Sequence, residues 1–131
     1  MYMRGETEVV MGDILAGDDA LRNAVRVATK ANAFKGYDET LSAKSVATQM
    51  VKSTKALKAD AVDIYYLHNP DPKVPILETL RAVDELHKAG KFNELGALAA
   101  RRLADGSRRR RERVGDIPWG RVAATPRPRR G

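Results

Sequence analysis

The architecture follows from two segments, Val25-Arg-Val-Ala-Thr-Lys30 and Val62-Asp-Ile-Tyr-Tyr-Leu-His68-Asn-Pro-Asp71. Each begins as a short run of mostly β-branched, aromatic or small apolar residues, which is typical of a buried strand. Each run then reaches a side chain that is able to carry a positive charge. Because the carboxyl ends of parallel strands carry the chemistry in β/α proteins, we expect Lys30 and His68 to be parts of one site.

Each of these residues also has a plainer interpretation when it is taken alone. A lysine at the end of an apolar strand is often solvated at the rim or paired with an acid. His68 could donate to a nearby carbonyl group in a structural role. His87 falls on a predicted helix among surface residues, and we expect it to have no function.

The chain has the length of one ordinary domain, 131 residues, and 43% of them are hydrophobic. It contains no cysteine, which excludes a disulfide scaffold, a thiolate metal site and a cysteine nucleophile. No run approaches the roughly 18 apolar residues that a membrane span needs, and the first residues lack the apolar core of a signal peptide. We expect a soluble, cytoplasmic protein with no membrane partner and no bound metal.

Basic residues are unevenly distributed along the chain. Residues 1–96 hold 13 Lys and Arg against 14 Asp and Glu, a net charge of −1, whereas residues 97–131 hold 11 Arg against 3 acids, a net charge of +8. The second segment lacks lysine and contains an arginine block at 107–113 and a proline-broken run at 124–131. We therefore place a domain boundary after Gly96, followed by an Arg-rich tail that we expect to be disordered from about residue 105.

Two predicted helices are defined by their apolar faces. The first starts around Glu6, presents Val10 and Ile14 on one face, and ends near Gly17, whose flexibility suits a left-handed cap. The second covers residues 42–57. Its apolar stripe has a period of 3.6 and contains Ala43, Val46, Ala47, Met50, Thr54 and Leu57.

The other elements complete an alternating order. Pro75 suits the first position of a third helix, and Gly90 lies where a glycine commonly follows a helix. Strands are predicted at 25–30, 61–67 and 91–96. The order α-β-α-β-α-β with short connections predicts an α/β fold with a parallel sheet and right-handed crossovers.

Four segments of the body, in matching order and spacing, resemble the aldo-keto reductase superfamily. They are Tyr2 followed by Gly5-Glu-Thr-Glu8, then Ala28-Thr-Lys-Ala-Asn32, then Asp63-Ile-Tyr-Tyr-Leu-His-Asn-Pro-Asp71, then Gly90-Lys-Phe-Asn-Glu-Leu-Gly96. Within the superfamily the chain is most similar to the aflatoxin-aldehyde and succinic-semialdehyde reductase subgroup. The resemblance implies a (β/α)8 TIM barrel, of which residues 1–96 are a partial slice. It also implies an NADPH-dependent oxidoreductase that reduces small aldehydes and ketones to alcohols.

The resemblance also implies catalytic residues. Members use a tetrad of Asp, Tyr, Lys and His; Tyr2, Lys30 and His68 match the last three, while the aspartate position would precede Met1. Carbonyl reduction leaves charge on the oxygen, so a tyrosine acts as general acid and a histidine orients the oxygen. A neighbouring ammonium lowers the tyrosine pKa from its ordinary value of about 10. We expect Tyr2, as the second residue, to be poorly fixed.

After Gly96 the sequence departs from the family pattern. Ala97-Leu-Ala-Ala100 stands where members have a Ser-Asn pair that contacts the nicotinamide carboxamide, and no cofactor-binding residues are identified. Three strands also leave two open sheet edges. We therefore expect this chain to be a fragment that is inactive alone, and to be marginally stable unless it associates. Its oligomeric state is left open.

The sequence is also compatible with other interpretations. The Arg-rich tail could bind nucleic acid or an acidic partner through counterion release, but only Trp119 offers a stacking platform, so we favour a solvated tail. A tail that begins where the family pattern stops is also consistent with a misassigned exon or reading frame. The element order alone also fits an open parallel sheet of another α/β family, although no glycine-rich nucleotide turn is present.

Overall fold

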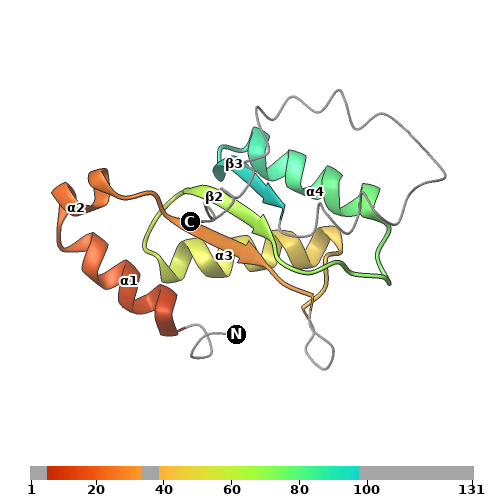
Figure 1. Cartoon of the computed structure of the whole chain (residues 1–131), viewed down its shortest axis with the longest axis horizontal. Helices are drawn as coiled ribbons and strands as arrows, with labels where there is room; N and C mark the ends of the chain where they lie inside the picture. The colour runs from red at the N-terminus through yellow and green to blue at the C-terminus, as the bar shows by residue number, and fades with distance from the viewer. Residues whose placement is uncertain (1–5, 34–38, 98–131) are drawn as a thin grey trace, which may run out of the picture.

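The structure, a computed structural model, describes residues 6–33 and 39–97, in which four helices and three strands alternate (Figure 1). The predicted alternation is confirmed, with one short additional helix before the first strand. That strand begins at Ala28 and not at Val25, because Val25 caps the additional helix. The elements are α1 (Glu6–Ala16), α2 (Asp19–Ala24), β1 (Ala28–Ala31), α3 (Ala43–Ala56), β2 (Val62–Leu67), α4 (Ile76–Lys88) and β3 (Phe92–Ala97).

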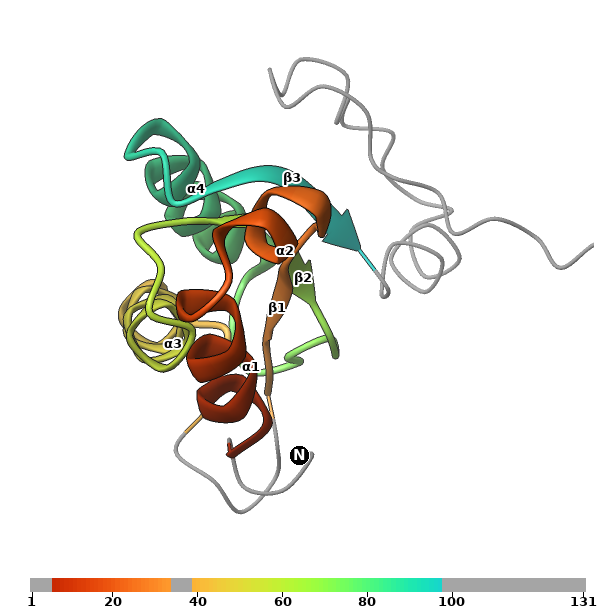
Figure 2. The same cartoon turned by 90° about the vertical axis from the view of Figure 1, so that its left-hand side faces the viewer.

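The three strands form one parallel sheet in the order β1-β2-β3. The register places Lys30 beside Tyr66, and Tyr66 beside Gly96. Because side chains alternate along a strand, these residues share one face, whereas Thr29 and Tyr65 belong to the other. Helices α3 and α4 pack on that second face, as the view in Figure 2 shows. The predicted parallel sheet is therefore confirmed.

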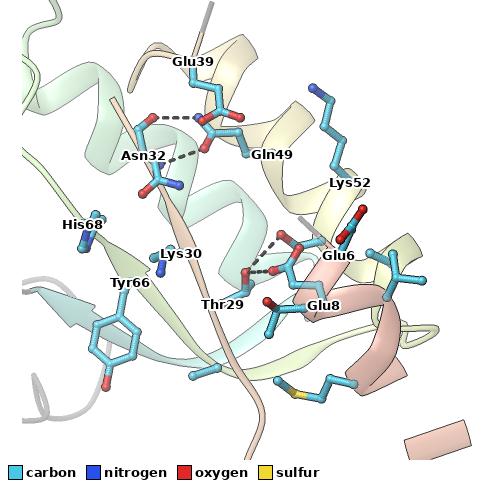
Figure 3. A pocket seen from close by; sticks show the side chains of 16 residues that line it. Glu6, Glu8, Thr29, Lys30, Asn32, Glu39, Gln49, Lys52, Tyr66 and His68 are labelled. Atoms are coloured by element: carbon cyan, nitrogen blue, oxygen red, sulfur yellow. Dashed lines mark hydrogen bonds between the residues drawn. The ribbon is translucent and has the colours of Figure 1, made fainter. Parts of the chain in front are cut away.

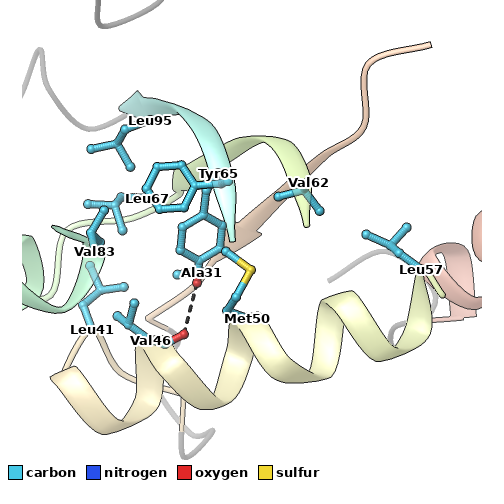
Figure 4. Close-up of a cluster of buried hydrophobic side chains, with 11 residues drawn as sticks. Ala31, Leu41, Val46, Met50, Leu57, Val62, Tyr65, Leu67, Val83 and Leu95 are labelled. Carbon is cyan, nitrogen blue, oxygen red and sulfur yellow. Dashed lines mark hydrogen bonds between the residues drawn. The ribbon is translucent and has the colours of Figure 1, made fainter. Parts of the chain in front are cut away.

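The hydrophobic core lies between the sheet and helices α3 and α4. Tyr65 is fully buried at its centre, and its hydroxyl donates to Val46 O at 3.2 Å (Figure 4). Phe92 packs on Tyr65 with ring centroids 5.6 Å apart, and the half-buried ring of His87 lies 5.3 Å from Phe92. His87 thus contributes to packing. The other members of the core are Ala31, Leu41, Val46, Met50, Leu57, Val62, Leu67, Val83 and Leu95.

The buried face of α3 differs from the predicted stripe. Ala43 and Ala47 are exposed, and Gln49 and Ser53 are buried in their place, each with 7% of its surface exposed. Ser53 is hydrogen-bonded to Thr29 on β1, and Gln49 to the backbone of Asn32 directly after β1, so their burial carries no desolvation penalty of an unpaired group. The residues that are buried as predicted are Val46, Met50 and Leu57.

The predicted apolar face of α1 is wrong. Val10 and Ile14 are 56% and 55% exposed, and the buried residues of this helix are Gly12 and Leu15. A Cβ added at Gly12 would overlap the backbone of α3 at Ala56 O. The close approach of the two helices, which only glycine permits, therefore selects the buried face of α1.

The helix ends lie close to the predicted positions, but the capping arrangements differ in part from those predicted. The helix α1 ends at Ala16 as expected, but Gly17 does not adopt the left-handed conformation. Gly90, by contrast, has φ of 70° after α4. Pro75 caps α4 from the position before its first residue, and the Ser42 side chain caps α3 by accepting from the N–H of Ser45.

Three further expectations concern membrane spanning, the domain boundary and the two ends of the chain. No helix in the two described ranges is long and apolar enough to cross a membrane. Strand β3 runs to Ala97, one residue past the predicted boundary at Gly96. The predictions for Tyr2 and for the tail from residue 98 onward lie outside the described residues.

Candidate active site

The carboxyl ends of β1 and β2 bring Lys30 and His68 to one place. The backbone N–H of His68, directly after β2, donates to Ala31 O at 2.9 Å. The side chains of Lys30 and His68 are half-buried and line the same cleft, which has a volume of about 740 Å³ (Figure 3). The structure thus brings two of the three predicted site residues together, while Tyr2 lies outside the described part of the chain.

Burial, together with the positive charge of Lys30, lowers the pKa of His68 below its ordinary value of 6.5. The imidazole is therefore neutral near pH 7 and offers one N–H donor and one acceptor nitrogen. An ammonium next to a neutral imidazole is suited to hold an oxygen atom on which negative charge develops.

Tyr66 adds an aromatic surface next to Lys30. It is half-buried, lines the same cleft, and directs its hydroxyl away from Lys30 and His68 in Figure 3. Its ring covers Gly96 on the neighbouring strand, where an added Cβ would overlap the ring atoms. Tyr66 was not among the predicted site residues, although a tyrosine and a glycine at equal distances before two strand ends are a signal for such a pair.

Beneath Lys30, a buried polar layer joins three elements. The hydroxyl of Thr29 donates to Glu8 Oε1 at 2.5 Å and is hydrogen-bonded to Ser53 Oγ at 3.0 Å. These contacts connect β1 to α1 and to α3 on the face opposite Lys30. Glu8 and Thr29 are recognisable in the sequence only as parts of the family-like segments, because apolar periodicity does not reveal buried polar pairs.

Two side-chain oxygens of residues that line the cleft are buried acceptors. Asn32 is 8% exposed, and its Oδ1 has no hydrogen-bond partner within the described residues. The same holds for Oε2 of Glu39, which lines the cleft as well. No group of three or more His, Asp or Glu side chains in residues 6–33 and 39–97 is arranged to hold a metal ion.

Comparison with known proteins places this arrangement in a family. The profile described as "Aldo/keto reductase family" matches residues 1–100. "Aflatoxin B1 aldehyde reductase member 2" of Rattus norvegicus is 43% identical over 96 residues, which are 73% of this chain and 26% of the relative. "Aflatoxin B1 aldehyde reductase member 4" of Homo sapiens is 41% identical over 96 residues, with 73% and 28% covered. The chain thus spans about a quarter of the length of these relatives.

A solved structure matches in the same way. The holo form of aldo-keto reductase AKR11C1 from Bacillus halodurans aligns with a TM-score of 0.62 and 29% identity, over 74% of this chain and 33% of that one. The predicted fold class, a slice of a β/α barrel, is confirmed by this match together with the parallel sheet. With its first 100 residues matched by the family profile, the chain belongs to the aldo/keto reductase family.

Proposed function

We propose that this chain carries the carbonyl-binding residues of an NADPH-dependent reductase of small aldehydes and ketones. Lys30 and His68 are its polar groups, and Tyr2 is its general acid. The observation that carries the proposal is the placement of an ammonium and a neutral imidazole at adjacent strand ends in one cleft. The aldehyde reductases among its relatives support the same substrate class.

The roles of the residues follow from the charge that reduction creates. A carbonyl oxygen bound in the cleft accepts an N–H from His68, which orients the carbonyl. The ammonium of Lys30 stabilises negative charge as it develops on that oxygen. In the proposal Lys30 also lowers the pKa of the Tyr2 phenol, which then delivers the proton near neutral pH.

NADPH supplies a hydride when it is bound, but the described cleft does not fit its phosphates. Three carboxylates, Glu6, Glu8 and Glu39, line the cleft together with two lysines, Lys30 and Lys52. Phosphates are bound by cations and by helix N-termini, and extra carboxylates repel them. The described residues therefore fit the carbonyl compound and not the nucleotide, and we expect the purified chain to oxidise no NADPH with an aldehyde.

A chimera with a full-length relative tests whether the site residues work when the rest of the protein is present. In it, the 96-residue matching segment of the rat relative is replaced by the corresponding residues of this chain. Aldehyde-dependent NADPH oxidation, followed at 340 nm with 4-nitrobenzaldehyde or succinic semialdehyde, is expected to persist in the chimera. Lys30→Met and His68→Ala are expected to reduce its kcat by roughly 100-fold or more.

The matched control is Lys44→Met, which removes an exposed lysine from α3. It should leave the kcat of the chimera unchanged. An active chimera that tolerates both Lys30→Met and His68→Ala would refute the proposed roles. Turnover of NADPH by this chain alone, without the chimera, would instead refute our expectation that the chain is inactive by itself.

We also propose that residues 1–96 form the reductase-related domain and that residues 97–131 are a separate Arg-rich segment, because the charge changes from −1 to +8 at this point. A chain that ends at Ala97 should give the same backbone NMR resonances for residues 6–33 and 39–95 as the full chain. Widespread shifts in these resonances would contradict the boundary.

A further inference from the structure

Gln49 is a buried polar residue on α3 that neither the hydrophobic core nor the proposed chemistry uses. Only 7% of its surface is exposed. Its Oε1 accepts from the backbone N–H of Asn32 at 2.8 Å, and its Nε2 donates to Asn32 O at 3.1 Å (Figure 3). The same Nε2 lies 3.0 Å from Thr40 O and 3.1 Å from Ser45 Oγ. A side chain with this many partners has a defined position.

The two hydrogen bonds between Gln49 and Asn32 lie directly after the last residue of β1. Strand β1 ends at Ala31, whose carbonyl accepts from the N–H of His68. Asn32 comes next, and the amide of Gln49 pairs with both of its backbone polar groups, as a neighbouring strand would do. The pairing extends the fixed part of the strand by one residue beyond the sheet.

This fixed point lies close to Lys30 in the chain. Asn32 is two residues after Lys30, and both side chains line the cleft. On the other side of Lys30, Thr29 is held by Glu8 and Ser53. The backbone that carries Lys30 is thus held from α3 both before and after this residue, while His68 is held by the ladder to Ala31.

We propose that Gln49 is a positioning residue, which fixes the end of β1 through Asn32 and thereby sets the distance between Lys30 and His68 in the cleft. The consequence for carbonyl chemistry rests on the proposed function. The claim about position does not, because it concerns only the geometry of this chain.

The alternative is that Gln49 has a purely structural role. Tyr65→Phe is the variant against which Gln49→Met is compared to distinguish the two. Tyr65 also makes a buried hydrogen bond between the sheet and α3, from its hydroxyl to Val46 O, but at the centre of the core and not at the end of β1. Loss of either bond should lower stability. Only the loss of Gln49 should change the spacing of Lys30 and His68.

The test measures how strongly Lys30 acts on His68 in the full chain, without cofactor or carbonyl compound. The pKa of His68 is read from its imidazole NMR signal, with the signal of His87, on α4, as the internal reference. Removal of a positive charge by Lys30→Met should raise the pKa of His68. This rise is measured in the wild-type background, in Gln49→Met and in Tyr65→Phe.

We expect a smaller rise in Gln49→Met and an unchanged rise in Tyr65→Phe. Because Coulombic energy falls inversely with distance, doubling the separation of the two groups would roughly halve the rise. An equal rise in all three backgrounds overturns the proposal, and so does the absence of any rise in the wild type. The exposed control Thr48→Val, which removes a side-chain bond to Lys44 O on the same helix, should behave as the wild type does.

A second measurement applies even where Gln49→Met does not fold. In the wild-type chain, the backbone N–H of Asn32 should exchange with solvent slowly, because a buried side chain accepts it. Exchange as fast as that of an exposed amide overturns the proposal. Neither readout depends on NADPH oxidation, so failure of the proposed function leaves this inference intact, and the reverse also holds.

Discussion

Tyr66 and Gly96 are paired across β2 and β3, and the ring of the tyrosine occupies the volume in which any other residue at position 96 would place its Cβ. The pair lies on the face of the sheet that also carries Lys30. The ring of Tyr66 on β2 thus fills the space that Gly96 on β3, which has no side chain, leaves open. This packing directs Tyr66 along the sheet surface and keeps its hydroxyl away from His68 (Figure 3).

Gly96→Ala should therefore destabilise the protein. The added methyl group overlaps the Tyr66 ring, and such overpacking costs about 1–3 kcal/mol of unfolding free energy. Urea denaturation followed by circular dichroism gives the value. In a Tyr66→Leu background, which removes the ring, the same substitution should have a much smaller effect. Equal losses in both backgrounds would show that the ring is not the cause.

Sequence reasoning located the elements of this fold better than the faces that they bury. The pattern at 42–57 predicted α3 correctly, but it assigned Ala47 to the core, where the structure places Gln49 and Ser53. Hydrophobic periodicity counts apolar residues, and a polar residue joins a buried face only when a partner on another element satisfies it. Such partners, here Thr29 on β1 and Asn32 directly after it, are not visible in the sequence of α3 alone.

The residues of the candidate site likewise fall into those that the sequence predicts and those that it does not. Lys30 and His68 could be found from the sequence because strand ends and chemical character are local features. Tyr66 depends on the register of β2 and β3, which the sequence does not give directly. Gln49 depends on a contact between residues 17 positions apart. The parts that were missed are therefore those that long-range packing determines.

His68 should make stability depend on pH. Its pKa in the folded protein is lowered, so below pH 6.5 the unfolded chain binds a proton more readily than the folded protein does. The contribution of His68 is fully present above pH 6.5 and is lost as pH falls toward its folded pKa. The urea midpoint should accordingly fall from pH 7 to pH 5, and His68→Gln should flatten this dependence. A dependence of the same slope in His68→Gln would exclude His68 as its source.

Gly12→Ala should be more destabilising than a typical helix substitution. The replacement would normally favour a helix, since alanine has the higher propensity, by about 1 kcal/mol. Here the methyl group meets the backbone at the end of α3, at Ala56 and the capping residue Leu57, which cannot move aside as a flexible side chain can. We expect a net loss of about 1–3 kcal/mol in urea denaturation.

Gly17→Ala is the matched control for this substitution. A Cβ at Gly17 would make only ordinary contacts, 3.6 Å from carbonyl oxygens of its own helix, and Gly17 has no positive φ. It should change the unfolding free energy by no more than about 0.5 kcal/mol. A tolerated Gly12→Ala would contradict the close approach of α1 and α3.

Val10→Lys and Ile14→Lys should improve the solubility of the chain without lowering its stability. Both side chains are more than half exposed on α1, and three further apolar residues, Val9, Leu21 and Val25, are exposed nearby in the sequence. Exposed apolar patches promote aggregation, and a lysine at such a position removes apolar surface without disturbing the core. Light scattering during a thermal melt should show a higher onset temperature of aggregation for the double variant, with the midpoint of unfolding unchanged.

Val46→Lys, at a buried position of α3, is the contrasting variant. It should abolish the cooperative unfolding transition altogether. Marginal stability of the chain is part of the same expectation: a cooperative transition well above ~50 °C in the wild type would contradict it.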